Sequence, residues 1–381
     1  MKIYSDRKYL PARFRQCHLL YPFWEYRPLP DSAPEFRPLF DNAELNVNRL
    51  KKYVERGRSI FELTELKDAQ VAVLPFDWRL IEHSDLLSGN DSAIAPEPAH
   101  ALMLAQEMAA AVASAAKPLC VFFSHDNDTR RIPLRNSFIF RRSLLRSRQQ
   151  PNEFALPLWV GDEIEAAFNG DLPMRTKNSR PIVSFMGYDP LAGSEKGTKK
   201  SLLRSIAAAL RAALTDAHRT HPFQARSAAL DLLSRSSGLT CKFVIRRQWW
   251  NGAVLPCSMD STLVQRSHRE FVTNMINSDY VLCVRGQGNC SYRLYETLCN
   301  GRIPIFVNTD CVMPYDKWID WTQYCVWVEE RDLPRVADIV LDFHERISPR
   351  RFQELQKACR QLWLDWLSPQ GFFSNFYRFF A

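Results

Sequence analysis

Long apolar runs are missing from this sequence, and so is an apolar segment at its start. No stretch approaches the ~20 consecutive apolar residues that a membrane-spanning helix needs. The opening MKIYSDRKYLPARFRQ also lacks the apolar core of a secretory signal peptide. We therefore expect neither a membrane-spanning helix nor a secretory signal.

Paired cysteines and paired carboxylates are scarce as well. None of the ten cysteines forms a C-x-x-C pair, and several lie in apolar segments, which predicts reduced, buried thiols rather than disulfides. His218 and His221 are closely spaced but lie in a polar segment. The nearest approach to an Asp-x-Asp motif is Asp126-Asn-Asp128. The sequence therefore predicts no metal site and no bound cofactor.

Composition favours two domains and acidic partners. A chain of 381 residues, 46% of them hydrophobic, exceeds the size at which a single core stops growing. The net charge of +8 and the pI of about 9.0 favour nucleotide phosphates, an anionic glycan or an anionic lipid surface as partners. Basic residues gather in 130–148, where aromatic side chains for base stacking are few. We interpret this segment as a solvated basic helix or loop, with a lipid or acidic-acceptor surface as the alternative, and expect no nucleic-acid partner.

Short apolar segments alternate with helical ones, which predicts an α/β fold with parallel sheets. We expect an N-terminal domain over residues 1–172, a linker at 173–180, a second domain over 181–345 and a helical C-terminal segment over 346–381. The expected strands are 71–74, 119–123, 182–186, 241–245, 280–284 and 303–307, and the expected helices are 100–116, 200–217, 267–277 and 292–299.

The most informative segment is a glycine-rich loop between a strand and a helix. A strand at 280–284 leads into Arg285-Gly-Gln-Gly-Asn-Cys-Ser291, and a helix follows at 292–299. Gly301 suits the left-handed conformation that ends a helix. A loop that opens a helix in this way offers backbone N–H groups and a positive helix end to an anion, so we expect a phosphate here.

The helix that follows this loop carries a charged pair on one face. Arg293, Glu296 and Thr297 lie at spacings of three and four and therefore share that face. A guanidinium suits a diphosphate and a carboxylate suits the hydroxyls of a ribose, which together are the shared part of a nucleotide sugar. An ordinary ion pair on a solvated helix face is the alternative.

These residues resemble the donor-binding half of exostosin-like glycosyltransferases. The family pattern is a strand ending in Cys, then Arg-Gly, Ser-x-Arg-x-x-Glu-Ala, a helix and Gly-x-Ile-Pro-Val. The corresponding residues here are Cys283-Val-Arg285-Gly286, Ser291-Tyr-Arg293-Leu-Tyr-Glu296-Thr297 and Gly301-Arg-Ile303-Pro304-Ile305. Thr297 replaces the usual alanine. Pro314, Asp320-Trp321 and the acidic segment 329–333 also fall where the family has similar residues.

Weaker similarity extends over most of the chain, except the first 60 and the last 35 residues. It covers 66–76, the strand at 119–123 with His125-Asp126 behind it, the strand at 180–187 that ends in Gly187, and 197–203. Lys200 stands where the family usually has arginine, which keeps the charge but loses the planar fork.

The resemblance implies a GT-B fold, with two Rossmann-like domains facing across a cleft and a C-terminal helix that crosses back to the first domain. It implies an inverting, metal-independent transfer from a nucleoside-diphosphate sugar, most simply a UDP-sugar, to a glycan or glycolipid in polysaccharide synthesis. The donor-binding residues would be Gly187, Lys200, Arg285, Gly286, Gly288, Ser291, Arg293, Glu296 and Thr297. Without an anchor, we expect a cytoplasmic location, with peripheral contact to the inner face of the membrane as an option.

Strand ends suggest the acceptor side, because ligands of open α/β sheets bind beyond the carboxyl ends of the strands. Asp77-Trp78 follows one strand of the first domain and His125-Asp126 follows another. We predict Asp126 as the general base, with His125 as the second choice. A purely structural role for the His-Asp pair, holding the loop, is the alternative.

Two other interpretations stay open. Gly286-x-Gly288-x-x-Ser291 is one residue short of a dinucleotide fingerprint, with Asp310 about 20 residues on, which would fit an NAD(P)-dependent oxidoreductase. A non-catalytic partner of another transferase is the second.

The aromatic stretch 362–380 either docks on the protein or lies at a membrane interface, and we favour docking. Oligomeric state cannot be inferred.

Overall fold

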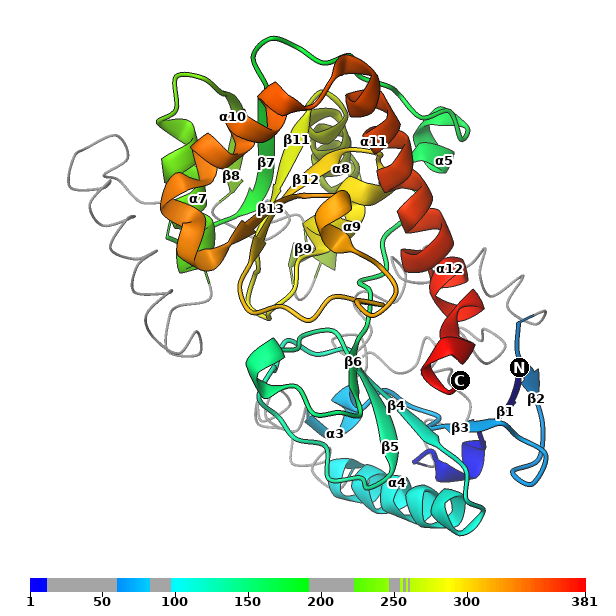
Figure 1. Cartoon of the computed structure of the whole chain (residues 1–381). Helices are drawn as coiled ribbons and strands as arrows, with labels where there is room; N and C mark the ends of the chain where they lie inside the picture. Colours follow the sequence, from blue (N-terminus) through cyan, green and yellow to red (C-terminus); the bar gives the residue numbers. More distant parts are fainter. Residues whose placement is uncertain (12–59, 83–96, 192–222, 247–253, 256–257, 260) are drawn as a thin grey trace. The chain divides into compact units, whose positions relative to one another are not determined.

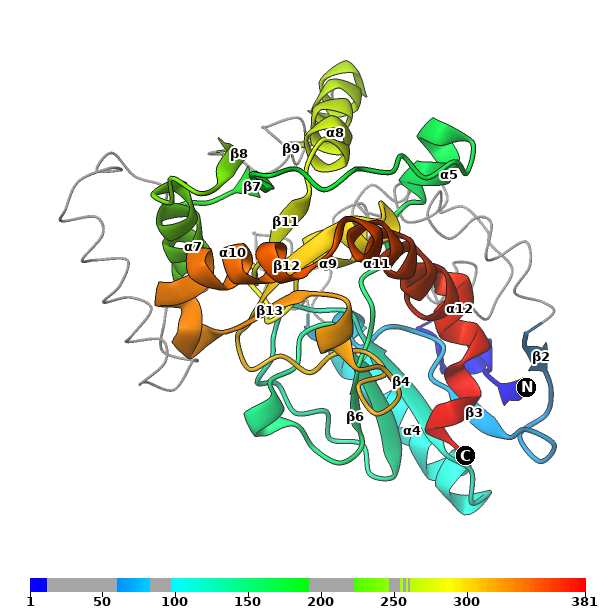
Figure 2. The same cartoon turned by 45° about the horizontal axis from the view of Figure 1, so that its top comes forward.

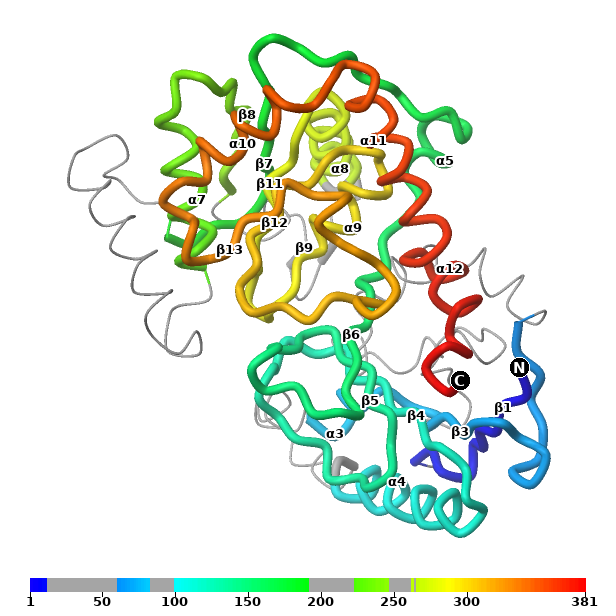
Figure 3. The backbone as a smooth tube through the Cα atoms, in the orientation of Figure 1, coloured from blue at the N-terminus to red at the C-terminus, as the bar shows by residue number. Residues whose placement is uncertain are grey.

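The computed structural model describes residues 1–11, 60–82, 97–191, 223–246, 254–255, 258–259 and 261–381 (Figure 1). These residues form two compact units. Unit 1 consists of residues 1–159 and 366–381, and unit 2 of residues 160–365. Both chain ends therefore belong to unit 1 (Figure 3). The predicted helix at 200–217 and Lys200 lie outside the described residues.

Unit 1 is built on a parallel six-stranded sheet in the order β2-β1-β3-β4-β5-β6. Its strands are β1 Lys2–Tyr4, β2 Glu62–Leu63, β3 Val71–Val73, β4 Leu119–Phe123, β5 Ser137–Arg141 and β6 Glu153–Ala155, and its helices include α3 Arg79–Glu82 and α4 Glu97–Ser114. Strand β4 is buried throughout, as its unbroken apolar run predicts for a central parallel strand. Ala101, Ala105 and Met108 of α4 belong to the same core as Val121 and Phe123.

The aromatic C-terminal segment packs on unit 1. After α11 (Pro349–Leu362), a single π-helical turn at Trp363–Leu367 leads into α12 (Pro369–Ser374) and the 3-10 turn Phe376–Phe379. The rings of Phe372, Phe376 and Phe379 lie 4.9–6.2 Å from the ring of Phe140 on β5. Phe372 and Phe376 are fully buried. This packing agrees with the docking that we favour from the sequence.

Unit 2 is built on a parallel five-stranded sheet in the order β13-β12-β11-β7-β8 (Figure 2). Its strands are β7 Ile182–Tyr188, β8 Thr240–Arg246, β11 Tyr280–Cys283, β12 Ile303–Asn308 and β13 Val326–Glu329; a short hairpin, β9 Val254–Leu255 and β10 Ser258–Met259, is separate. Helices α7 (Gln224–Ser234) and α10 (Val336–Arg346) pack together, and α8 (Ser261–Ile276) lies on the opposite face of the sheet (Figures 1 and 2). Helix α9 (Tyr292–Cys299) packs on β11 and β12.

Both units are thus α/β with parallel sheets, as the sequence predicts. Strand β4 and helix α9 have the predicted bounds, and the other predicted elements that the structure describes differ by one to three residues at their ends, except that α8 begins six residues earlier. Strands β1, β2, β5, β6 and β13 and helices α7 and α10 are not among the predicted elements. Gly301 has φ +57 after α9, the left-handed conformation expected of a helix-ending glycine. The cysteines of the described ranges are thiols, as expected. Within those ranges no helix has the length and apolarity to cross a membrane.

The segment predicted as a linker belongs to unit 2, whose first residue is Val160. Arg175 Nε donates to Asp279 Oδ1 at 2.7 Å, and Asn178 Nδ2 donates to Asp279 Oδ2 at 3.2 Å. Asp279 is fully buried at the start of β11. Arg302, also fully buried, donates to the carbonyl of Pro173. Residues 173–180 are therefore fastened to the amino-terminal end of the sheet, because two buried charges need them as partners.

Candidate functional site

The sheet order of unit 2 points to one edge of the sheet as the expected position of a ligand. Numbered by their place in the chain, the strands lie across the sheet in the order 2-1-3-4-5 (β8-β7-β11-β12-β13), so the winding direction reverses between β7 and β11. In open α/β sheets, ligands bind beyond the carboxyl ends of the strands at such a reversal. Gly187 lies at the end of β7, and Arg285 and Gly286 follow β11. The topology thus brings the predicted glycine loop and Gly187 to the same edge.

Arg293 and Gly187 are in direct contact at this edge. A Cβ added to Gly187 would lie 3.1 Å from an Arg293 terminal nitrogen, so a side chain at 187 would displace the guanidinium. The guanidinium also stacks 5.2 Å from the ring of Phe185 and 4.6 Å from the ring of Phe271. Two aromatic faces and a glycine therefore fix where Arg293 presents its charge.

Arg293 is paired with Glu296 one turn later, with Nε 3.3 Å from Oε2. This is the ion pair of the alternative interpretation, but it does not lie on a solvated face, because the two side chains are only 16% and 23% exposed. Burial lowers the pKa of Arg293, and Glu296 opposes the effect. A partly buried guanidinium with one carboxylate partner can still donate hydrogen bonds to further anionic oxygens.

Arg226 is a site residue that the sequence analysis missed. From α7 it donates to Tyr188 O at 2.8 Å, to Val284 O at 3.3 Å and to Arg285 O at 2.8 Å. It thereby joins the carboxyl ends of β7 and β11. Burial, and next to it the charge of Arg293, lower its pKa to about 10. No motif surrounds Arg226 in the sequence, so only the fold reveals it.

The glycine loop is held by its own backbone and by the next loop of the sheet. Gly286 N donates to Cys290 O, and Asn289 Nδ2 donates to Asp310 O. Thr309 Oγ1 donates to Asn289 Oδ1 at 2.7 Å. Gly288 is buried within this loop. Ser291 is the N-cap of α9, yet its side chain makes no capping hydrogen bond, which leaves the first N–H groups of the helix for an anion.

Acidic groups flank Arg285 beyond the ends of β12 and β13. Burial raises the pKa of Glu330, while Arg285 lowers it and Asp310 raises it. The three charges are thus close enough to influence one another. Arg285 itself donates to Gln287 O at 3.3 Å. This side of the loop combines one cation with two carboxylates, which suits a ligand with both phosphate and hydroxyl groups.

The predicted donor residue Thr297 lies in the core of unit 2. Thr297 is fully buried, its Oγ1 donates to Arg293 O, and Cys283 Sγ lies 3.5 Å from that oxygen. A threonine in a helix that packs on a strand satisfies its hydroxyl on the preceding turn. Thr297 is therefore a core residue between α9 and β11.

In unit 1 the predicted acceptor residues Asp77 and Trp78 have structural roles instead. Both oxygens of Asp77 accept from Ser124 N, and Oδ1 also accepts from Arg79 N. Trp78 is 1% exposed, and its Nε1 donates to Glu82 Oε1. Strand-end position alone cannot show that backbone N–H groups already use a carboxylate. Asp77 thus connects the loops after β3 and β4.

His125 and Asp126 differ in availability. Asn127 N donates to His125 Nδ1 at 3.0 Å, and the imidazole stacks 5.6 Å from Phe123. Burial lowers the pKa of His125. Asp126 is 40% exposed and pairs with Arg142, whose NH2 group lies 2.8 Å from Oδ1. The carboxylate of Asp126 is therefore the more accessible of the two, with one oxygen engaged.

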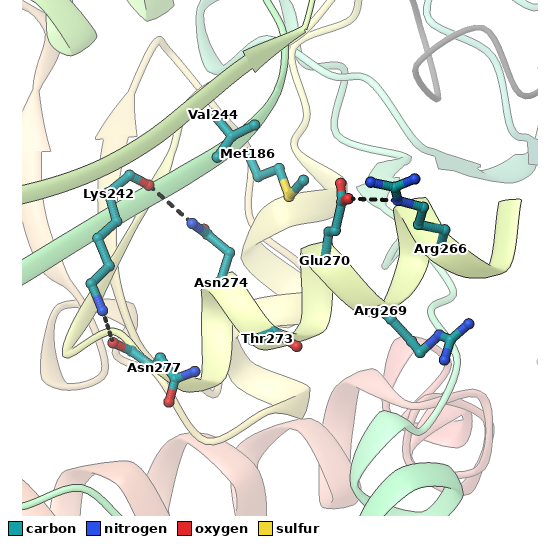
Figure 4. A pocket seen from close by; sticks show the side chains of 9 residues that line it. All are labelled: Met186, Lys242, Val244, Arg266, Arg269, Glu270, Thr273, Asn274 and Asn277. Atoms are coloured by element: carbon teal, nitrogen blue, oxygen red, sulfur yellow. Dashed lines mark hydrogen bonds and ion pairs between the residues drawn. The ribbon is translucent and has the colours of Figure 1, made fainter. Parts of the chain in front are cut away.

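An open pocket of 630 Å³ lies elsewhere in unit 2, between α8 and the strands β7 and β8 (Figure 4). Its polar groups largely satisfy one another. Lys242 Nζ donates to Asn277 O, Asn274 Nδ2 donates to Lys242 O, and Arg266 pairs with Glu270. None of the glycine-loop residues lines it. We therefore place the functional site at the strand reversal and not in this pocket.

Comparison with known proteins finds sequence similarity in the second half of the chain. Residues 200–342 match the exostosin GT47 domain. The chain is 34% identical over 94 residues to Exostosin-1 of Drosophila melanogaster, which is 25% of this chain and 12% of that protein. It is 29% identical over 94 residues to an Exostosin-1 homolog of Caenorhabditis elegans, 25% of this chain and 24% of that protein. A probable glucuronosyltransferase of Oryza sativa subsp. japonica is 34% identical over 70 residues, 18% of this chain and 16% of that protein.

The matches thus span at most about a quarter of these relatives. A solved glycosyltransferase from Rickettsia africae superposes with a TM-score of 0.35 at 12% identity, covering 93% of this chain and 83% of that one. At that TM-score the superposition carries no argument. The predicted resemblance to exostosins is confirmed for residues 200–342, a range that includes Gly286, Arg293 and Glu296.

Proposed function

Proceeding from the exostosin GT47 domain at residues 200–342, we propose that this chain is a glycosyltransferase with a nucleoside-diphosphate sugar as donor. The observation that carries the proposal is the contact of Arg293 with Gly187 at the strand reversal, beside the open N-terminus of α9. A planar cation and a row of N–H groups at this position match the oxygens of a diphosphate. Glu296 and the acidic groups near Arg285 would meet ribose or sugar hydroxyls.

The proposed reaction is a single displacement with inversion. An acceptor hydroxyl oxygen attacks the anomeric carbon as the bond to the diphosphate oxygen breaks, and the hydroxyl proton passes to a general base. Negative charge grows on the leaving diphosphate. That charge would be stabilised by Arg285, Arg293 and the backbone amides of 286–291. Such electrostatic stabilisation of the transition state is usually the largest single contribution to catalysis. Because these groups supply the positive charge, we propose that the transfer needs no metal.

Asp126 remains our proposed base. Its carboxylate is exposed enough to meet an acceptor, whereas His125 Nδ1 already accepts a backbone N–H. The acceptor would be a glycan or a glycolipid in polysaccharide synthesis. A cytoplasmic location, with peripheral contact to a membrane, fits such an acceptor and remains part of the proposal.

One observation favours a second candidate. Asp310 lies two residues beyond the carboxyl end of β12. In a dinucleotide-binding fold, the acid that binds the ribose lies at the end of the corresponding strand. Against it, Ser291 occupies the position of the third glycine, and the domain match is to transferases. A non-catalytic transferase partner would keep the same fold and lose turnover.

A thermal-shift screen tests the proposal. Purified full-length protein would be melted with UDP-, GDP-, dTDP-, CMP- and ADP-sugars and with NAD, each with and without EDTA. We expect stabilisation by one nucleoside-diphosphate sugar, unchanged by EDTA, because a ligand that binds only the folded state raises the melting temperature. Stabilisation by NAD alone would favour the oxidoreductase. Slow hydrolysis of the stabilising sugar nucleotide would separate an enzyme from a non-catalytic partner.

A further inference from the structure

Arg226 donates hydrogen bonds to backbone carbonyls of the protein. Its three acceptors are the carbonyls of Tyr188, Val284 and Arg285, which are the last groups of β7 and the first groups behind β11. These carbonyls belong to two neighbouring strands on either side of the reversal. One planar fork can hold both strand ends, whereas a point-like ammonium cannot reach in both directions.

The same guanidinium lies directly beneath the glycine loop. A Cβ added to Gly286 would be 3.3 Å from an Arg226 terminal nitrogen, so the loop backbone rests against the guanidinium. The ring of Phe223 stacks on it at 5.0 Å and that of Phe185 at 5.7 Å. Its Nε is buried and has no hydrogen-bond partner in the described part of the chain. The Arg226 guanidinium thus contacts two aromatic rings and the glycine loop.

Two guanidiniums are consequently held close together at one edge of the sheet. Phe185 contacts both Arg226 and Arg293, and each of the two cations has only partial compensation by a carboxylate. Two like charges in a partly buried position repel each other, and a bound anion near both of them would offset the repulsion. The arrangement therefore favours a ligand with more than one negative charge.

We propose that Arg226 is a positioning residue of this site, which fixes the Arg285–Gly286 turn so that its amides and Arg293 face a diphosphate. The proposal rests on the donor site described above. Arg226 contacts the loop and the strand ends, and its effect on the ligand passes through them. It sets the preference of the site for a diphosphate over a monophosphate, because only a correctly placed turn can serve both phosphate groups.

Calorimetric titration of the full-length protein at low temperature tests this role. The probes are inorganic pyrophosphate, orthophosphate and the nucleoside diphosphate that the wild-type chain binds. We expect Arg226→Lys to weaken pyrophosphate and nucleoside diphosphate at least about tenfold, the effect of roughly one lost charged hydrogen bond. Orthophosphate should weaken much less. The Lys variant keeps the charge, so its failure to bind shows that the fork geometry matters.

Arg235→Lys is the matched control, because Arg235 is the C-cap residue of the same helix and pairs with Asp231 at the end of α7 remote from Arg226. We expect its pyrophosphate affinity to change less than about twofold, in the range of ordinary surface substitutions. A purely structural role of Arg226 would lower the melting temperature of Arg226→Lys but leave the affinity of the folded fraction unchanged, which would overturn the proposal.

If Arg226→Lys does not fold, Phe223→Leu carries the test, since it removes one stacking ring without touching the loop. We expect it to weaken pyrophosphate about threefold, and unchanged affinity would contradict the proposal. A wild-type chain that binds no nucleoside diphosphate and no pyrophosphate would remove the proposed function together with this inference. Wild-type binding that Arg226→Lys and Phe223→Leu preserve would overturn the inference alone.

Discussion

At the scale of single residues, burial decides which charged side chains can act on a ligand. Arg293 and Glu296 are partly exposed and lie at a strand reversal, whereas Asp77 and Thr297 are already bonded within the protein. These four residues share motif or strand-end positions in the sequence. Their exposure and their hydrogen-bond partners in the structure distinguish the candidates for ligand binding from the residues that hold the fold together.

Replacing Glu296 tests the ribose side of the donor site. Glu296→Ala should weaken binding of the free nucleoside diphosphate by about 1.5–3 kcal/mol, the contribution of a hydrogen bond to a charged group. It should also lower stability, because Arg293 loses its carboxylate partner in a buried position. Calorimetry and thermal melts measure the two effects separately.

The control is Glu354→Ala, since Glu354 also pairs with an arginine on its own helix but at the surface of α11. It should leave both affinity and melting temperature nearly unchanged. Nucleoside diphosphate binding that survives Glu296→Ala unaltered would show that this face of α9 does not meet the donor.

Replacing Asp126 tests the general base. Asp126→Asn keeps the size of the side chain but removes the proton acceptor, so turnover should fall by about 10²–10⁴-fold while donor affinity holds. His125→Ala should cost less, because its Nδ1 accepts the Asn127 N–H and thereby orders the loop. Initial rates of sugar transfer at saturating donor measure both.

Asp128→Asn, in the same loop, is the matched control and should keep most of the activity. If His125→Ala were inactive and Asp126→Asn nearly fully active, His125 would be the general base and Asp126 the residue that orients it. Activity in both variants would place the base elsewhere in the chain, and Asp77 would not replace it, because its oxygens accept backbone N–H groups.

At the scale of elements, local rules explain what the sequence could predict. The bounds of α9 were predictable because a loop precedes it and a left-handed glycine ends it. β4 was predictable from five consecutive apolar residues in a buried parallel strand. Arg226 was not, because its partners are carbonyls of strands 38 to 59 residues away. The backbone partners of Asp77 could not be predicted either, because a strand-end position says nothing of the N–H groups around it.

Substituting Gly301 tests the end of α9. Gly301→Ala places a Cβ at φ +57, only 2.7 Å from Leu172 Cδ1 and 3.1 Å from Gln356 O. The conformation and the crowding together should cost more than about 1 kcal/mol of folding free energy. Urea unfolding followed by fluorescence measures the loss.

Gly170→Ala is the control with the same conformational demand, since Gly170 has φ +86 but its nearest neighbour is the end of a flexible glutamate at 3.4 Å. Gly301→Ala should destabilise more than Gly170→Ala. Equal effects would mean that packing against Leu172 does not limit this helix end.

At the scale of the whole molecule, buried polar contacts connect distant segments of unit 2. Tyr280 OH lies 2.8 Å from His344 Nδ1, and His344 Nε2 lies 2.7 Å from Asn178 O. The carbonyl of Asn178 can only accept, so Nε2 carries the proton and Tyr280 donates to Nδ1. This neutral imidazole joins the 173–180 segment to α10 and β11.

Acidification should therefore destabilise unit 2. Burial lowers the pKa of His344 below its ordinary value of 6.5, so the unfolded chain takes up the proton first. The stabilisation is complete above the unfolded pKa and is lost as the pH falls below it. Urea unfolding at pH 7.5 and pH 5 should show a larger loss for the wild type than for His344→Gln.

His125 contributes in the same direction, because burial also lowers its pKa. His125→Gln serves as the comparison that isolates the contribution of unit 1. An acid sensitivity that His344→Gln leaves unchanged would show that the contact between Tyr280 and His344 does not control this pH dependence.

The most direct test of the central claim is calorimetric titration of nucleoside diphosphates into wild-type protein and Arg293→Lys, in EDTA. We expect the wild type to bind one diphosphate per chain and Arg293→Lys to bind it at least about tenfold more weakly, because an ammonium loses the bidentate contact. No binding by the wild type, or equal affinity in the two proteins, would contradict the assignment of the strand reversal as a diphosphate site.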